Sequence, residues 1–144
     1  MELVADELKL CLKIGENLRQ IDNRSASVRP APGKWSKKEI LGHLIDSATN
    51  NHQRFVRMQL TAHLELPGYD QEEWVRLQHY QDRPWREIID MWQVYNTQLV
   101  EVIRNIDPKA LRNTWSAPDG KDVDLEFVVR DYLVHMRHHI DQIL

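Results

Sequence analysis

Apolar residues recur at helical spacing along most of the chain. A first amphipathic segment is predicted over about Glu2–Asp22, and its apolar members are Leu3, Leu8, Leu10, Leu12, Ile14, Leu18 and Ile21. Residues 25–34 are polar and include two prolines and a glycine, a composition typical of a loop. The pattern contains no internal repeat and no convincing pair of strands.

A second long helix has a clear start signal. Ser36 and Glu39 have the spacing of a capping box, and the apolar pattern that follows predicts a helix to about Ala62. The connection after it contains a turn over 67–70 and then a short helix that Asp70 would cap. Long ordered connections often cover a functional site, so this segment is of interest.

Two further helices complete the pattern. One begins near Pro84, a residue that the first turn of a helix tolerates, and continues to Asp107. The other is predicted over Leu125–Leu144, with Asp124 as its N-cap. Four long helices predict an all-α fold, a four-helix bundle with elaborated connections, and the length fits a single domain over residues 1–144.

Composition and charge exclude several functional classes. The formal net charge is −3 and no basic block is present, which argues against a general nucleic-acid binder. The single cysteine, Cys11, excludes an intrachain disulfide framework and indicates a reducing compartment. No apolar run reaches membrane-spanning length, and the N-terminus lacks the features of a secretory signal. We therefore expect a soluble, cytoplasmic protein that contacts neither nucleic acid nor membrane.

The strongest chemical signal is a pair of histidines on the last predicted helix. His135 and His139 are four residues apart, so their rings lie on one face and can reach one metal ion. His43, on the second helix, is a third candidate ligand. Three histidines leave coordination positions open, as in catalytic metal sites. Seven histidines in one chain also produce such pairs by chance, so a structural role remains the alternative.

The second helix carries an unusually polar face beside His43. Ser47, Asn50 and Arg54 follow it at helical spacing, and Tyr132 lies on the histidine stripe of the last helix. These four residues are predicted to line a substrate pocket, in which Arg54 suits a carboxylate. A solvated or dimer-facing patch is the alternative interpretation of this face.

Other side chains near the histidines are candidates for supporting roles. Asp46, Asp131 and Gln142 are placed to hold the second nitrogen of a ligand histidine. The five tryptophans are mostly packing residues, although Trp35, Trp74 and Trp115, in or near connections, are also candidates for cavity walls.

Three segments together resemble the DinB-like (DinB/YfiT) superfamily, which is unrelated to the DNA polymerase of that name. They are WSKKEILGHLID at 35–46, LPGYDQEEW at 66–74 and HMRHH at 135–139. The resemblance implies an up-down-down-up bundle, often a homodimer. It also implies a divalent metal held by His43, His135 and His139, commonly nickel or zinc, with iron and manganese as further options.

The same resemblance implies a small-molecule substrate but leaves the reaction open. Characterised members of the family include thiol S-transferases that use low-molecular-weight thiols, and others are assigned as metal-dependent hydrolases using metal-bound water. Asp46 and Asp131 fit supporting roles better than that of a general base, so the sequence favours the transferase, in which a thiolate needs less help. A non-catalytic bundle that binds a metal or small ligand is the remaining alternative.

Overall fold

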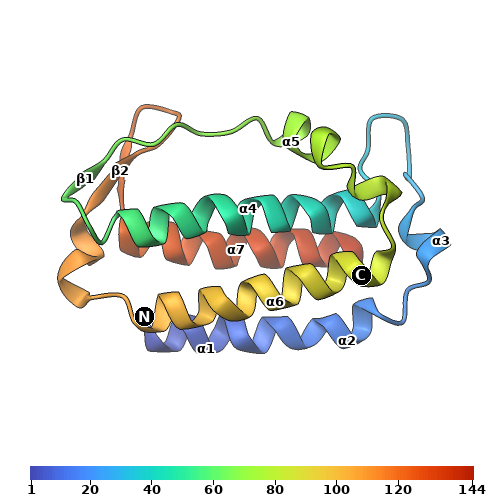
Figure 1. Cartoon of the computed structure of the whole chain (residues 1–144), viewed down its shortest axis with the longest axis horizontal. Coiled ribbons are helices and arrows are strands. Elements are labelled where there is room, and N and C mark those ends of the chain that lie inside the picture. The colour runs from blue at the N-terminus through green and yellow to red at the C-terminus, as the bar shows by residue number, and fades with distance from the viewer.

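Four long helical segments lie side by side along the computed structural model, which describes residues 1–144 (Figure 1). The segments are α1 (Glu2–Cys11), continued by a 3₁₀ turn (Leu12–Ile14) and α2 (Gly15–Leu18), then α4 (Lys37–Arg57), α6 (Trp85–Arg104) and α7 (Leu125–Ile143). The first and last run in one direction and α4 and α6 in the other, so the up-down-down-up order is confirmed.

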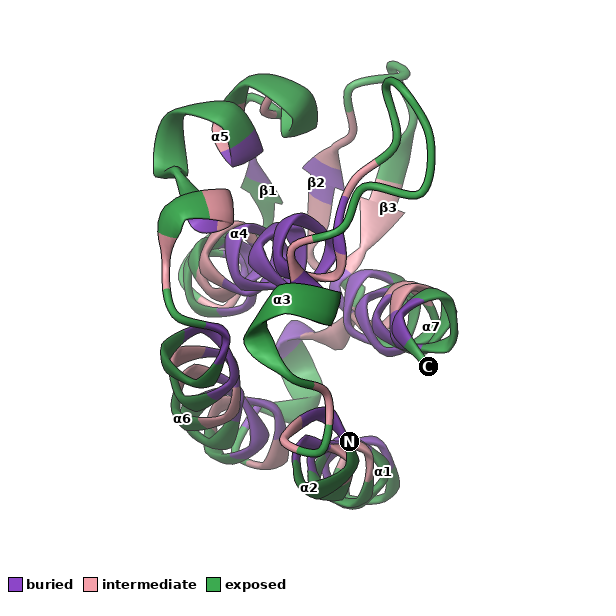
Figure 2. Ribbon diagram, turned by 90° about the vertical axis from the view of Figure 1, so that its right-hand side faces the viewer, coloured by how far each residue is buried: buried purple, intermediate pink, exposed green.

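Helix α4 occupies the most enclosed place in the bundle. It packs against α6 and α7, while α1 packs against both of these from the opposite side (Figure 2). The connection from α4 to α6 runs back along α4, and its short helix α5 (Gln71–Gln78) packs on α4 as well. Every residue in 38–48 is therefore buried, including several polar ones.

Local signals explain where the helices begin. The Ser36 backbone N–H donates to Glu39 Oε2 at 2.9 Å and the Glu39 N–H donates to Ser36 Oγ at 3.2 Å, which confirms the predicted capping box. Asp70 accepts from the Glu73 N–H and caps α5, and Asp124 caps α7 in the same way. A short helix α3 (Asn23–Ala26), which the polar pattern did not predict, lies in the first connection.

The predicted extension of the second helix to Ala62 is wrong, because α4 ends at Arg57. The side chain of Asn113 donates to the carbonyl of Met58 at 2.7 Å and satisfies one of the acceptors that a helix end leaves free. Ala62 then accepts from the Thr114 N–H at 2.9 Å, which draws the chain into a strand.

A small sheet, absent from the sequence-based prediction, lies at this end of the bundle. Strand β1 (His63–Leu64) pairs in parallel with β2 (Thr114–Ser116), which pairs antiparallel with β3 (Asp122–Asp124). The strands are two or three residues long, too short for an alternating pattern to be recognised. A turn with Gly120 at φ +80° joins β2 to β3.

Short 3₁₀ turns complete the connections, at Tyr80–Asp82 before α6 and at Pro108–Arg112 after it. The core is made of side chains from all four long segments, and its largest fully buried members are Trp85, Trp92, Phe55, Leu8, Leu18, Leu41, Leu44, Met58, Ile88, Ile89, Leu99 and Ile103. None of the helices combines the length and the apolar character that crossing a bilayer requires.

Candidate metal centre and adjoining pocket

Three histidine side chains converge between α4 and α7. His43 is fully buried, whereas His135 and His139 are half-buried. One ring nitrogen from each lies within 4.8 Å of the others, and Nε2 of His43 lies 3.1 Å from Nε2 of His135. The two helices pack side by side, so the tertiary fold brings His43 to the pair that helical spacing already places together.

The surroundings keep these imidazoles neutral. Burial, reinforced by repulsion from the neighbouring imidazoles, lowers the pKa of His43 from 6.5 to about 3. The same causes lower the pKa of His135 to about 4, and burial lowers the pKa of His139. All three rings are therefore uncharged near pH 7, which is the form that binds metal ions.

The donor set fits a divalent ion of the zinc or nickel kind. Nitrogen ligands at 2.0–2.1 Å from a tetrahedral ion lie about 3.3 Å from one another, close to the 3.1 Å between His43 and His135. Neutral imidazole suits zinc, nickel, copper and iron, and no carboxylate contacts the three rings. The His43 ring offers its Nε2 to the cluster, because that atom faces Nε2 of His135, while its Nδ1 is buried without a hydrogen-bond partner.

Asp46 lies one helical turn after His43 and is fully buried. Its Oδ1 accepts from the Tyr80 hydroxyl at 2.8 Å and from the Gln78 side-chain amide at 3.0 Å, while its Oδ2 has no partner. Burial raises the pKa of this carboxyl to about 6. Asp46 makes no hydrogen bond to a histidine, in contrast to the role expected from the sequence, because Tyr80 and Gln78 on the crossover bind its carboxylate.

The other two expected supporting residues differ from each other. Gln142 lies with its Oε1 3.1 Å from Nδ1 of His139, and its amide nitrogen lies 2.9 Å from Nε2 of His138. This contact can orient the His139 ring. Asp131 is exposed one turn before His135 and makes no hydrogen bond or ion pair, so it does not hold His135 as the sequence suggested.

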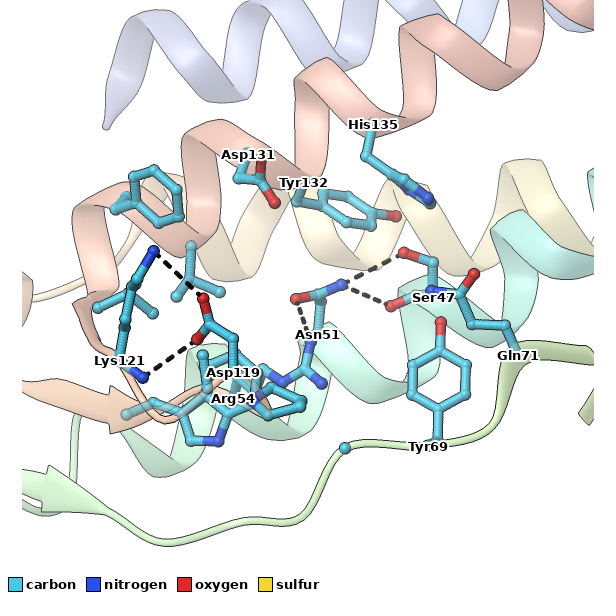
Figure 3. Close-up of a pocket in the computed structure, with 17 residues that line it drawn as sticks. Ser47, Asn51, Arg54, Tyr69, Gln71, Asp119, Lys121, Asp131, Tyr132 and His135 are labelled. Atoms are coloured by element: carbon cyan, nitrogen blue, oxygen red, sulfur yellow. Dashed lines mark hydrogen bonds and ion pairs between the residues drawn. The ribbon is translucent and has the colours of Figure 1, made fainter.

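A polar pocket of about 540 Å³ adjoins the cluster at His135 (Figure 3). One wall comes from α4 and another from α7, and the crossover and the β2–β3 turn enclose the rest. The lining includes three of the four residues that the sequence assigned to a substrate pocket, which are Ser47, Arg54 and Tyr132.

The prediction that Asn50, the fourth of these residues, lines the pocket is wrong. Its side chain folds back and donates to the backbone carbonyl of Asp46 at 2.9 Å. The neighbouring Asn51 lines the pocket instead and donates to the Ser47 carbonyl and hydroxyl at 2.9 and 3.3 Å. Position 51 lies one turn after Ser47 on the wall of the pocket, whereas the side chain of Asn50 turns away from it.

Further site residues come from connections, where helical spacing gives no information. Tyr69 on the crossover and Trp115 in β2 both line the pocket. Trp115 was one of three tryptophans considered as cavity walls. Trp35 instead packs its ring 5.1 Å from that of His43, and Trp74 packs its ring 5.0 Å from that of Tyr69 without lining the pocket. Tyr80, which binds Asp46, carried no signal in the sequence.

Comparisons with known proteins agree with this architecture. Two relatives carry the name "Putative metal-dependent hydrolase". The one from Oceanobacillus iheyensis is 22% identical over 126 residues, covering 85% of this chain and 71% of its own. The one from Halalkalibacterium halodurans is 23% identical over 109 residues, covering 76% and 63%.

A solved structure and a family model extend the comparison. YfiT from Bacillus subtilis, described as a probable metal-dependent hydrolase with an unusual four-helix bundle topology, superposes with a TM-score of 0.83. It has 19% sequence identity, and the match covers 97% of this chain and 83% of that one. The family model of the DinB superfamily matches residues 16–143. The chain, with three histidines converging between α4 and α7, therefore belongs to the DinB superfamily.

Proposed function

We propose that this protein is a metal-dependent enzyme in which His43, His135 and His139 hold one divalent ion at the end of the polar pocket. The observation that carries the proposal is the convergence of three neutral imidazoles from two helices, with His135 also lining the pocket. A purely structural site would be closed by a fourth protein ligand, and no fourth side chain of a metal-binding type joins the cluster.

The bound ion would supply a Lewis acid that polarises a substrate oxygen and lowers the pKa of a water or thiol. The protein would determine the direction of approach. His43 is fully buried and Trp35 packs beside it, so a substrate reaches the cluster from the pocket, past His135. Gln142 would keep the His139 ring in position through Nδ1.

Hydrolysis is the reaction that we favour. Asp131 lines the pocket one turn from His135 and has no hydrogen-bond or ion-pair partner, so its carboxylate is free to accept a proton from an attacking water. The names of the two relatives, and the description of YfiT, support the same class. The substrate would be a small molecule, because the pocket measures about 540 Å³.

Thiol S-transfer is the second candidate. The contacts of Asp46 favour it, because this buried carboxylate accepts hydrogen bonds from Tyr80 and Gln78 and is not available as a base at the cluster. A thiol deprotonates more readily than water, so a low-molecular-weight thiol would need no such base. Nickel and zinc are the first metals to consider for either reaction, followed by iron and manganese.

Metal content is the first test. The protein, purified without an affinity tag or chelator, should contain about one equivalent of a divalent metal, or take it up on titration. The His43→Ala/His135→Ala variant should bind none. The control is His138→Ala, which removes a neighbouring histidine outside the cluster. It should bind as much metal as the wild type. If the wild-type protein binds none of nickel, zinc, iron and manganese, the proposal is overturned.

Activity then separates the two reactions. Metal-loaded protein is assayed against a panel of ester and amide substrates, and against thiol–electrophile pairs. For hydrolysis, Asp131→Asn should lower kcat by about 10²–10⁴-fold, the usual contribution of a general base. Asp141→Asn, on the exposed side of the same helix, is the matched control and should keep full activity. Thiol conjugation that is unaffected by Asp131→Asn would instead support the transferase.

A further inference from the structure

Arg54 is a buried cation without an anionic partner. Its residue surface is only 8% exposed, and it forms no ion pair with any carboxylate of the chain. Its single hydrogen bond runs from Nη1 to Oδ1 of Asn51, at 3.0 Å. The Nε is buried without a partner, and Nη2 makes no hydrogen bond. An unpaired buried charge is costly to the fold, so its presence requires another explanation.

The guanidinium is held in place by an aromatic ring. Its Cζ lies 4.0 Å from the centroid of Trp115, and the Trp115 ring is itself fixed by a hydrogen bond from Nε1 to the Leu66 carbonyl at 2.8 Å. These contacts restrict the side chain without neutralising its charge. Arg54 is therefore preorganised at one side of the pocket that also reaches His135 (Figure 3).

Of the two basic side chains that line the pocket, Arg54 is the one whose charge is not neutralised by an ion pair. Lys121 at the mouth is paired with Asp119 at 3.6 Å. Asp131 is the remaining acidic residue of the lining, and it is exposed and forms no ion pair with Arg54. The pocket thus has one enclosed positive site, with the edge formed by Nε and Nη2 free of protein partners.

We propose that Arg54, held on Trp115, binds a carboxylate of the substrate, which makes the substrate an organic acid. This inference rests on the proposed function, since it gives the substrate class of the same site. A guanidinium binds a carboxylate through charge-assisted hydrogen bonds, and Nη2 is the donor of Arg54 that is neither buried nor bonded to the protein.

The position of Arg54 on the helix separates the acid group from the reacting bond. Arg54 and His43 are eleven positions apart on α4, so their Cα atoms lie on the same face, about 16 Å apart along the axis. The long Arg54 side chain can reach back toward the start of α4 and cover part of that distance. The acid group that Arg54 binds and the bond that reacts at the cluster are therefore different parts of the substrate.

Binding of a simple carboxylate tests the proposal without any reaction. Hexanoate and its neutral isostere hexanamide are titrated into ¹⁵N-labelled full-length protein, and the dissociation constants are obtained from NMR shifts of the pocket residues. Hexanoate should bind at least tenfold more tightly than hexanamide. Arg54→Gln should weaken hexanoate binding about 10–100-fold, as expected for a lost charge-assisted hydrogen bond, and leave hexanamide unchanged.

Two further variants sharpen the result. Arg54→Lys keeps the charge but lacks the planar edge, so it should give an intermediate loss and serves if Arg54→Gln fails to fold. Arg57→Gln removes an exposed arginine of the same helix and should bind hexanoate like the wild type. Equal binding of hexanoate by wild type and Arg54→Gln, or no preference over hexanamide, would overturn the proposal. Tighter binding of hexylphosphonate than of hexanoate would overturn the carboxylate assignment.

The metal-site variant separates this inference from the proposed function. His43→Ala/His139→Ala, which removes the two cluster histidines that do not line the pocket, should lose metal and still bind hexanoate through Arg54. Arg54→Gln should still bind metal. If the metal site fails its test while hexanoate binds through Arg54, the enzyme proposal falls and the acid-binding site stands. Loss of hexanoate binding in the histidine variant would show that the acid contacts the metal, and would overturn the role of Arg54.

Discussion

The histidine cluster should make the metal-free protein sensitive to mild acid. The folded protein keeps His43 and His135 neutral, with pKa values of about 3 and 4, whereas the unfolded chain protonates a histidine near pH 6.5. Below pH 6.5 the unfolded state therefore binds protons that the folded state excludes. The free energy of unfolding must fall as the pH decreases from 6.5 toward 4, because protons stabilise only the unfolded chain.

The magnitude follows from the burial of the two rings. Each pH unit in this window costs about 1.4 kcal/mol for each excluded proton. At pH 5, fully buried His43 contributes about 2 kcal/mol, and half-buried His135 about 1 kcal/mol after allowance for solvent screening.

Asp46 acts in the opposite direction. Its pKa is about 6 in the folded protein and 3.8 in the unfolded chain, so the folded state binds this proton first as the pH falls. At pH 5 this raises the free energy of unfolding by about 1.4 kcal/mol. The net loss between pH 7.5 and pH 5 is then about 2 kcal/mol.

Urea unfolding followed by circular dichroism, at pH 7.5 and pH 5 in the presence of a chelator, measures this loss. The comparison is with His43→Gln/His135→Gln, which removes both rings and should change the pH response by about 3 kcal/mol. His79→Asn is the control: His79 is exposed, outside the cluster, and has φ +55°, which asparagine tolerates. An identical pH response in the wild type and the double glutamine variant would show that the two histidines are not the source of the acid sensitivity.

Three more predictions follow from the same structure. Asp46→Asn should raise the free energy of unfolding at pH 7 by about 1–3 kcal/mol, since it removes a buried carboxylate whose pKa is raised to about 6; a decrease in urea unfolding would contradict this. Gly42→Ala should lower stability by about 1–3 kcal/mol, because its Cβ would lie 2.2 Å from the buried Tyr80 ring, whereas Gly15→Ala meets only a movable glutamine side chain and should change the melting temperature little. Zinc at 100 times its Kd should raise the free energy of unfolding of the wild type by about 2.7 kcal/mol and that of His139→Ala much less; equal stabilisation of the two in thermal unfolding would argue against His139 as a ligand.

Features that depend on neighbouring residues could be predicted from the sequence. The caps at Ser36, Asp70 and Asp124 follow from a side chain and a backbone N–H three residues away, and the structure confirms all three. The predicted end of α4 failed because a residue far along the chain determines it, since Asn113 satisfies the carbonyl of Met58. The strands failed for the same reason, because each is stabilised by pairing with a distant segment.

The candidate site likewise has some residues that local periodicity predicts and others that depend on distant segments. Helical periodicity places His135 and His139 on one face, and it also aligns Ser47 and Arg54 behind His43. It also placed Asn50 on that face and left Asn51 out, which is the reverse of what the pocket shows. Only the position of the crossover and of the β2–β3 turn decides which side chain borders the pocket.

Local signals were enough to predict the helices, their order along the chain and the residue types of a three-histidine site, because amphipathic period and capping act within one or two turns. The way in which those side chains are combined into a site depends on how the helices and connections pack. Packing of α4 against α7 joins His43 to the pair, the crossover brings Tyr80 to Asp46, and β2 brings Trp115 to Arg54. Those contacts join residues dozens of positions apart in the sequence, so no rule based on neighbouring residues predicts the partner of each side chain. Burial in the fold then determines whether these side chains are charged.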